Sequence, residues 1–209
     1  MYRKYICIND NMKTIATSYN KVAHDYVKQH GYGEHLALPS LISFIKKLKP
    51  QATVLDVGCG GGQDSKFFVE HGFKVLGIDV SKEMIKLARQ FAPQGEFKVI
   101  DFIKMPSTPK YDAIWCCRVF HHVSIKEQKK FLSKLRTLTK PGGYLYLTSV
   151  VSETKNDYEA YDSGSDKLLK KRLQAKTFKK IIGASGFEIK KFKYWVGKKG
   201  MEIVARKIC

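Results

Sequence analysis

The sequence predicts one α/β domain with a doubly wound, mostly parallel sheet of seven strands and helices on both faces. Three observations lead to this prediction. Between residues 53 and 151, short apolar runs alternate with helical patterns, as in consecutive βαβ units. A glycine-rich turn, Gly58 to Gly62, follows the first of these runs. Two β-rich runs at 187–196 and 201–208 are joined by four residues, too few for a crossover helix, so these strands must be antiparallel.

The remaining elements follow from hydrophobic periodicity and from helix start and stop signals. Helices are expected, in chain order, at 14–30, 39–49, 62–71, 81–91, 124–140 and 176–184. The strands before the antiparallel pair are expected at 53–58, 74–80, 96–101, 111–118 and 144–151. Residues 152–175 form an insertion that is rich in Asp, Ser, Tyr and Lys.

A basic stretch overlaps the end of this insertion. Residues 167–180 contain seven cations and no acid. As a helix, this stretch places Leu168, Leu169 and Leu173 on one side and covers the rest with charge. It is interpreted either as an amphipathic lid helix with a solvated face or as a rim that attracts anions to a substrate site.

The formal net charge of +19 raises the question of a nucleic-acid partner. The positive charge is spread over the whole chain, and only 6 of the 38 cations are arginine. Lysine lacks the bidentate fork with which arginine recognises phosphate and base edges. The composition therefore favours a solvated lysine surface, and nucleic acid remains the less favoured partner.

The composition also bears on compartment and metal binding. No apolar run reaches 18 residues, so no membrane span is expected, and the first ten residues do not resemble a secretory signal. The five cysteines form no C-x-x-C pair and no metal-ligand spacing. A reduced, cytoplasmic protein without a bound metal is expected. Cys116 and Cys117 lie on an apolar strand and are expected in the core.

The stretch VLDVGCGGG, residues 54–62, raises the question of which nucleotide its glycine loop cradles. Strand, loop, helix and second strand form a βαβ unit. A pyrophosphate at this helix N-terminus would be repelled by the carboxylate of Asp56. S-adenosylmethionine (SAM) has no phosphate but carries a sulfonium and an ammonium. Asp56 suits this cationic end, and the glycines allow close approach of the ligand.

Two further acids end the next two strands. Asp79 follows Gly60 by nineteen residues, where a carboxylate can accept both hydroxyls of a ribose. Asp101 ends the third strand and could accept the amino group of an adenine, with Phe102 near the ring. Because ligands of open α/β sheets bind at the carboxyl edge of the strands, Asp56, Asp79 and Asp101 predict a nucleoside site there.

Seven stretches of the chain together resemble a known family. They are VLDVGCGGG (54–62), VLGIDVSKEMIKLA (75–88), VIDF (99–102), YDAIWCCRVFHHV (111–123), LTKPGGYLYLT (138–148), YNKVAHDY (19–26) and FKKIIGASGFEI (178–189). In this order they resemble class I SAM-dependent methyltransferases, close to the type 11 group that includes the ubiquinone C-methyltransferases. The resemblance spans nearly the whole chain, and residues 152–175 diverge most.

The resemblance implies a single Rossmann-like domain over residues 1–209, with an N-terminal helical lid at 1–50 and a substrate cap at 152–175. It implies SAM as cofactor, S-adenosylhomocysteine as product, and a monomer or homodimer. The implied cofactor contacts are Tyr19, Tyr26, Asp56, Gly58, Cys59, Gly60, Asp79, Val80, Met84, Asp101, Phe102, Cys117 and Arg118. His121 and His122 follow the fourth strand, where the methyl group should point, and one of them is a candidate base or substrate-positioning group.

The implied reaction is in-line displacement at the sulfonium methyl by an electron-rich acceptor atom. The chain lacks a Pro-Pro-Tyr-type motif after the fourth strand and a Pro-Cys site. These absences favour a small-molecule acceptor over a nucleic-acid base. Two alternatives remain: a tRNA or rRNA methyltransferase that uses the basic 167–180 stretch, and a SAM-binding protein without catalytic activity.

Overall fold

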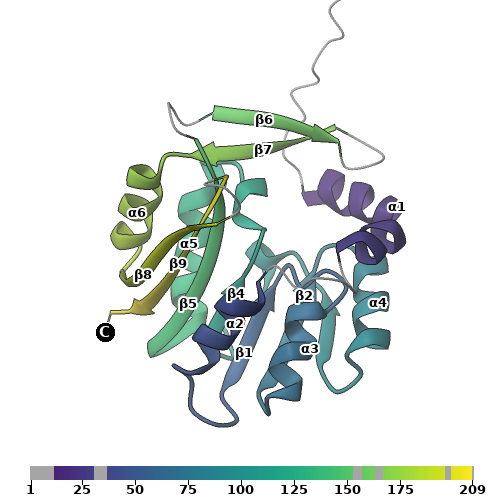
Figure 1. The fold of residues 1–209 in the computed structure, drawn as a ribbon, viewed down its shortest axis with the longest axis horizontal. Helices are drawn as coiled ribbons and strands as arrows, with labels where there is room; N and C mark the ends of the chain where they lie inside the picture. Colours follow the sequence, from purple (N-terminus) through teal and green to yellow (C-terminus); the bar gives the residue numbers. More distant parts are fainter. Residues whose placement is uncertain (1–11, 31–36, 153–156, 163–166, 196–198, 209) are drawn as a thin grey trace, which may run out of the picture.

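The computed structural model describes residues 12–30, 37–152, 157–162, 167–195 and 199–208. A twisted sheet crosses the centre of the molecule (Figure 1). Its parallel core runs in the order β3-β2-β1-β4-β5. These strands are β1 (Thr53–Val57), β2 (Lys74–Asp79), β3 (Glu96–Val99), β4 (Tyr111–Cys116) and β5 (Thr139–Val151). The predicted doubly wound sheet is confirmed, and the order reverses between β1 and β4, the point at which such sheets bind ligands.

The C-terminal strands are antiparallel, as their four-residue connection requires. β8 (Phe187–Trp195) pairs with β9 (Gly200–Lys207), and β9 pairs antiparallel with β5. The reversal places β9 beside the parallel core and β8 at an edge of the sheet. This confirms the prediction of a mostly parallel sheet closed by an antiparallel pair.

The helical interpretation of residues 167–173 is wrong, whereas the helix predicted at 176–184 is confirmed. Residues 167–173 form strand β7 (Lys167–Leu173), which pairs antiparallel with β6 (Asp157–Asp162). The end of β7 also pairs in parallel with the end of β5, where Val151 lies opposite Leu173. Gln174 is extended (ψ 143°), so helix α6 (Ala175–Ala184) begins only after it. Pairing with β5 and β6 overrides the helical pattern, and the described residues form nine strands instead of seven.

Helices cover both faces of the sheet (Figure 1). One face carries α2 (Leu38–Ile45), α3 (Gln63–Glu70) and α4 (Lys82–Phe91), while α1 (Met12–His30) packs on α4. The other face carries α5 (Ile125–Leu138) and α6. Phe44 and Phe68 pack against Trp115 and Tyr146 on the first face. Two short 3-10 turns, η1 (Phe102–Lys104) and η2 (Phe120–His122), follow β3 and β4.

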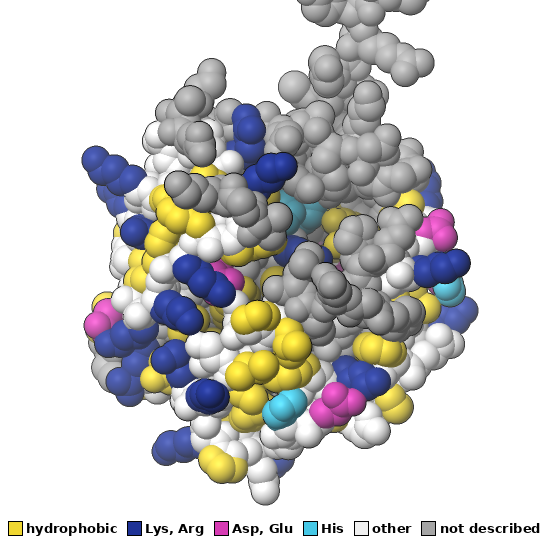
Figure 2. Space-filling view, viewed as in Figure 1, with side chains coloured by type: hydrophobic (Ala, Val, Ile, Leu, Met, Phe, Trp, Pro, Cys, Tyr) yellow, Lys and Arg dark blue, Asp and Glu magenta, His cyan; other side chains and the backbone are white. Residues whose placement is uncertain are grey.

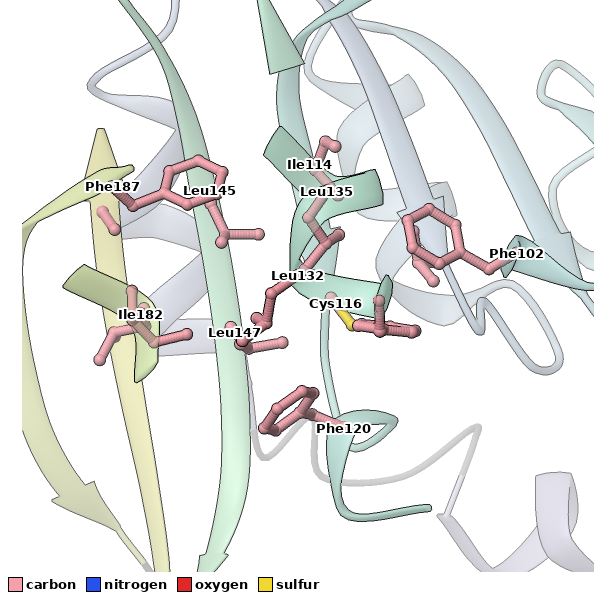
Figure 3. Close-up of a cluster of buried hydrophobic side chains, with 14 of the residues drawn as sticks. Phe102, Ile114, Cys116, Phe120, Leu132, Leu135, Leu145, Leu147, Ile182 and Phe187 are labelled. Carbon is pink, nitrogen blue, oxygen red and sulfur yellow. The ribbon is translucent and has the colours of Figure 1, made fainter. Parts of the chain in front are cut away.

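The larger core lies between the sheet and α5 and α6. Leucines of α5 meet the inward-facing residues of β4 and β5, and Ile182 and Phe187 close the cluster near the C-terminus (Figure 3). Cys116 is fully buried in this cluster, as predicted. The same prediction is wrong for Cys117, which is only partly buried and packs against the core of the other face. Each buried leucine, isoleucine and phenylalanine of the larger core gains about 1.5–3 kcal/mol from burial, so this packing fixes the strand ends that carry the site.

Three hydrogen-bonded polar side chains lie near the amino ends of β1, β4 and β5, and they yield a prediction for stability. Asp112 Oδ2 accepts hydrogen bonds from the backbone N (2.9 Å) and Oγ1 (2.6 Å) of Thr53 and from Nζ of Lys140 (2.8 Å). Burial raises the pKa of Asp112, but the bonds from Lys140 and Thr53 outweigh it and lower this pKa to about 2. Because the folded pKa lies below the ordinary 3.8, the bonds stabilise the fold above about pH 4.

Asp112→Asn is therefore expected to lower the free energy of unfolding by about 1 kcal/mol at pH 7, since solvent screens a side chain that is 38% exposed. The difference from the unsubstituted protein should shrink as the pH falls from about 4 toward 2. Urea unfolding of both proteins across this pH range measures the difference in the free energy of unfolding. Glu96→Gln, at a surface pair with Lys98, is the control and should have almost no effect. A pH-independent cost for Asp112→Asn would contradict the prediction.

Candidate functional site

A pocket opens at the carboxyl ends of β1, β2 and β4, and it holds about 1000 Å³ of open space including its mouth. The predicted residues in its lining are Tyr19, Tyr26, Asp56, Gly58, Cys59, Gly60, Asp79, Val80, Met84, Phe102, Cys117, Arg118 and His122. Asp101 and His121 are not part of the lining. Figure 2 shows histidine atoms in the hollow at the centre of the displayed face. The fold thus gathers residues from α1 and from several strand ends around one cavity.

The glycine loop folds back onto β2. The backbone N–H groups of Gly58 and Cys59 both donate to the carbonyl of Ile78, at 2.8 and 3.0 Å. Gly58 adopts a left-handed conformation (φ +70°), and a Cβ at this position would overlap Cγ2 of Val119. Glycine is therefore required here both by backbone conformation and by space.

Asp79 anchors this loop. Its Oδ2 accepts from the backbone N of Gly60 (3.1 Å), and its Oδ1 accepts from the backbone N of Ser81 (2.8 Å). Burial raises the pKa of Asp79, while these N–H donors act to lower it. Ser81 caps α4 by accepting from Met84 N and donates to Asn20 of α1 (2.8 Å). One carboxylate thus orders the loop at the pocket wall, and the neighbouring serine ties α1 to the site.

Asp56 lies behind the loop and is almost completely buried. It accepts a 2.6 Å hydrogen bond from Ser65 Oγ on α3. Burial raises the pKa of Asp56 well above its ordinary value, and the charges of Asp64 and Asp79 raise it further, while Ser65 lowers it. Asp56, Asp64 and Asp79 all line the pocket beside the loop, and the charges of Asp64 and Asp79 repel that of Asp56. A cationic ligand group in the pocket would relieve this repulsion.

Two further charged residues, Asp64 and Arg118, line the pocket, and Asp64 was not predicted from the sequence. Asp64 lies in the first turn of α3, lines the pocket and accepts a hydrogen bond from Trp115 Nε1 (2.5 Å). Arg118 follows β4 with φ +59°, and its backbone N donates to Thr148 Oγ1 (2.7 Å). The position of Asp64 at a helix N-terminus after a glycine loop was the available signal.

The structure distinguishes the two adjacent histidines. His122 lines the pocket, and its Nε2 lies 3.3 Å from the hydroxyl of Tyr19, at hydrogen-bonding distance. The ring of His121 packs against that of His122, with centroids 4.2 Å apart, but does not reach the lining. Tyr19 also meets Tyr26 edge to face at 5.6 Å. His122 is therefore the histidine that can contact a ligand.

Asp101 serves the local backbone. Its Oδ1 accepts from the N–H of Ile103 (3.1 Å) and caps η1, and Oδ2 lies 3.6 Å from Nζ of Lys104. Phe102, which follows it, is buried against Phe131 and lines the pocket. The structure thus places the predicted aromatic contact in the pocket wall and leaves the predicted adenine acceptor outside the lining.

Among the residues that the structure describes, no three His, Cys, Asp or Glu side chains gather in a way that could hold a metal ion. No described helix combines the length and apolarity needed to cross a bilayer.

The central part of the chain is similar to a known protein family. Residues 54–143 match the family described as methyltransferase domain. The ubiquinone biosynthesis O-methyltransferase of Acinetobacter baylyi is 30% identical over 110 residues, which cover 49% of this chain and 45% of that protein. The chain spans about half the length of the curated relatives it matches.

Two solved structures share the fold over nearly the whole chain. The 1,6-didemethyltoxoflavin-N1-methyltransferase of Burkholderia thailandensis, with bound 1,6-didemethyltoxoflavin and S-adenosylhomocysteine, aligns with a TM-score of 0.81 and 17% identity, covering 100% of this chain and 94% of that one. The magnesium protoporphyrin IX methyltransferase of Synechocystis PCC 6803, with bound SAM, has a TM-score of 0.74 and 20% identity, covering 97% and 99%. At these identities the likeness establishes the fold.

Proposed function

We propose that this chain, in which residues 54–143 form a class I SAM-dependent methyltransferase domain, transfers the methyl group of SAM to a small-molecule acceptor. The observation that carries the proposal is the set of three carboxylates, Asp56, Asp64 and Asp79, around the glycine loop. A pyrophosphate would be repelled by these carboxylates, whereas the sulfonium and ammonium of SAM would be attracted. The pocket is thus an acidic cavity in a protein with a net charge of +19.

The lining suggests how the cofactor lies. The carboxylate of Asp79 is proposed to accept the ribose hydroxyls, beside the loop that it already orders. Val80, Met84 and Phe102 provide apolar contacts for the adenine. Arg118 also lines the pocket, and its guanidinium is proposed to bind the carboxylate of the cofactor. This orientation directs the sulfonium methyl toward Tyr19 and His122.

Bound SAM supplies an electrophilic methyl carbon, so the protein mainly has to position the acceptor and manage one proton. His122 is proposed to accept that proton at Nε2 when the nucleophile is a hydroxyl or an N–H group. The hydroxyl of Tyr19 holds the imidazole at 3.3 Å and can exchange this contact for the acceptor. Positioning of this kind lowers barriers by about 7–11 kcal/mol, and a well-placed base contributes about 100- to 10,000-fold in rate.

Helix α1 is proposed to act as a lid. Val27 of α1 packs so closely on the loop that a Cβ on Gly61 would lie 2.6 Å from its Cγ2. Asn20 Oδ1 of the same helix accepts hydrogen bonds from Ser81 Oγ and from the backbone N of Glu83. The β6–β7 hairpin projects beyond the carboxyl end of β5 (Figure 1) and is proposed to cap the acceptor. Tyr158 and Tyr161 belong to this hairpin, and we expect them to contribute to the wall of the acceptor site, but their side chains lie outside those that the structure describes.

Small acceptors are supported by the compared proteins, which are named for a ubiquinone biosynthesis step, a toxoflavin precursor and a magnesium porphyrin. The alternative RNA acceptor would use the basic 167–180 stretch, which the structure divides between strand β7 and helix α6. Lysine and arginine are spread over the face in Figure 2, most densely on its β8–β9 side. We therefore retain the small-molecule acceptor.

Calorimetric titration tests the proposal, and the expected result is binding of S-adenosylhomocysteine without binding of NADH. An acceptor screen with methyl-labelled SAM, scored by S-adenosylhomocysteine release, then tests transfer. Tight NADH binding would refute the cofactor assignment. Stoichiometric methylation of a defined RNA position would refute the small-molecule acceptor and support an RNA acceptor. Cofactor binding without turnover on any acceptor would favour a non-catalytic SAM-binding protein.

A further inference from the structure

Trp115 does not line the pocket itself, but it forms a hydrogen bond to a residue that does. Its indole Nε1 donates to Asp64 Oδ2, which joins β4 to the first turn of α3. Asp64 is nearly buried and is part of the pocket lining. Because the indole N–H has a fixed direction in a packed ring, this bond fixes the direction in which the Asp64 carboxylate faces the pocket.

The Trp115 ring is itself held on both sides. It stacks on Tyr146 of β5 with centroids 3.7 Å apart and planes 7° from parallel. Phe44 of α2 and Phe68 of α3 meet it edge to face, at 5.3 and 5.5 Å. Trp115 is completely buried in this cluster, so its orientation is set by packing.

A second group of hydrogen bonds holds Tyr146. Its hydroxyl donates to Glu202 Oε2 (2.7 Å) on β9, and Ser40 Oγ of α2 lies 2.9 Å from both carboxylate oxygens of Glu202. Lys193 Nζ adds an ion pair at 3.2 Å. Hydrogen bonds thus connect Ser40 of α2 and Glu202 of β9 to Tyr146. The stack of Tyr146 on Trp115 and the Trp115–Asp64 hydrogen bond extend this connection to the pocket wall.

The three pocket carboxylates differ in their partners. Asp56 accepts from Ser65, and Asp79 accepts from two backbone N–H groups of the loop and α4. Asp64 accepts from Trp115, and Arg118 lines the same pocket as Asp64. A carboxylate and a guanidinium in one pocket complement a ligand end that carries an ammonium and a carboxylate on the same carbon.

We infer that Trp115 is a positioning residue that holds Asp64 toward the ammonium of the cofactor's amino-acid end. The Tyr146–Glu202–Ser40 hydrogen bonds hold Trp115 in turn. This inference rests on the proposed function, because it requires that SAM or its product bind in this pocket.

A pair of ligands isolates the effect. S-adenosylhomocysteine and 5′-methylthioadenosine share the adenosine and the sulfur, but only the first has the amino-acid end. Asp64→Asn keeps an acceptor for the indole and removes the charge. It should weaken S-adenosylhomocysteine binding by about 10- to 100-fold and leave 5′-methylthioadenosine binding within about twofold. Trp115→Phe keeps an aromatic ring against Tyr146 and should give the same selectivity at about 3- to 10-fold.

Trp195→Phe is the matched control. Its indole nitrogen has no hydrogen-bond partner among the residues that the structure describes, and it does not line the pocket, so neither affinity should change. Equal losses on both ligands in Trp115→Phe, or no loss on either, would overturn the inference. Thermal unfolding of each variant excludes misfolding, and Trp115→Phe decides the outcome if Asp64→Asn does not fold. An unsubstituted protein that binds neither ligand would remove the proposed function together with the inference.

Discussion

Gly58→Ala is expected to lower the free energy of unfolding by about 2–5 kcal/mol and to abolish binding of S-adenosylhomocysteine. The left-handed backbone of Gly58 (φ +70°) costs about 1–2 kcal/mol for a residue with a Cβ. The new methyl group would also overlap Val119, and overpacking of this kind costs about 1–3 kcal/mol. Urea unfolding measures the stability, and calorimetry measures the binding.

Gly60→Ala is the matched control for stability. Gly60 is also left-handed (φ +53°), but no atom lies within 4 Å of the position where its Cβ would stand. Gly60→Ala should therefore lower the free energy of unfolding by only about 1–2 kcal/mol, the cost of backbone strain. The double variant Gly58→Ala/Val119→Ala should recover part of the loss caused by Gly58→Ala. Equal destabilisation by the two single glycine substitutions would show that contact with Val119 is unimportant.

Asp79→Ala is expected to weaken S-adenosylhomocysteine binding by at least tenfold while the protein stays folded. Two ribose hydrogen bonds to a charged acceptor contribute about 1.5–3 kcal/mol each. The substitution also removes the acceptor of the Gly60 N–H, which loosens the loop before the ligand arrives. Calorimetric titration measures the loss, and far-UV circular dichroism checks the fold.

The ligand pair separates this effect from that of Asp64. Both S-adenosylhomocysteine and 5′-methylthioadenosine carry the ribose, so Asp79→Ala should weaken them by similar factors. An unchanged dissociation constant would place the nucleoside elsewhere in the protein. A loss confined to S-adenosylhomocysteine would assign Asp79 to the amino-acid end instead.

Local sequence determined the parallel core and the place of the pocket. Alternating strand and helix patterns fix successive parallel strands, and parallel strands bring their carboxyl ends to one edge. Asp56 and Asp79 could therefore be assigned to one site without coordinates, and Arg118 was added to that site by the resemblance to methyltransferases. The four-residue connection before β9 determined the antiparallel pair, because no crossover helix fits in it.

Tertiary packing decided what depends on partners distant in the chain. The Leu168–Leu173 stretch has a pattern that suits either a helix or a strand, and pairing with β5 and β6 selected the strand. His121 and His122 are adjacent in sequence, and only the packing of η2 against Tyr19 shows which one lines the pocket. The bond between Trp115 and Asp64 spans 51 residues. Its existence depends on the three-dimensional meeting of α3 and β4, which no local pattern encodes.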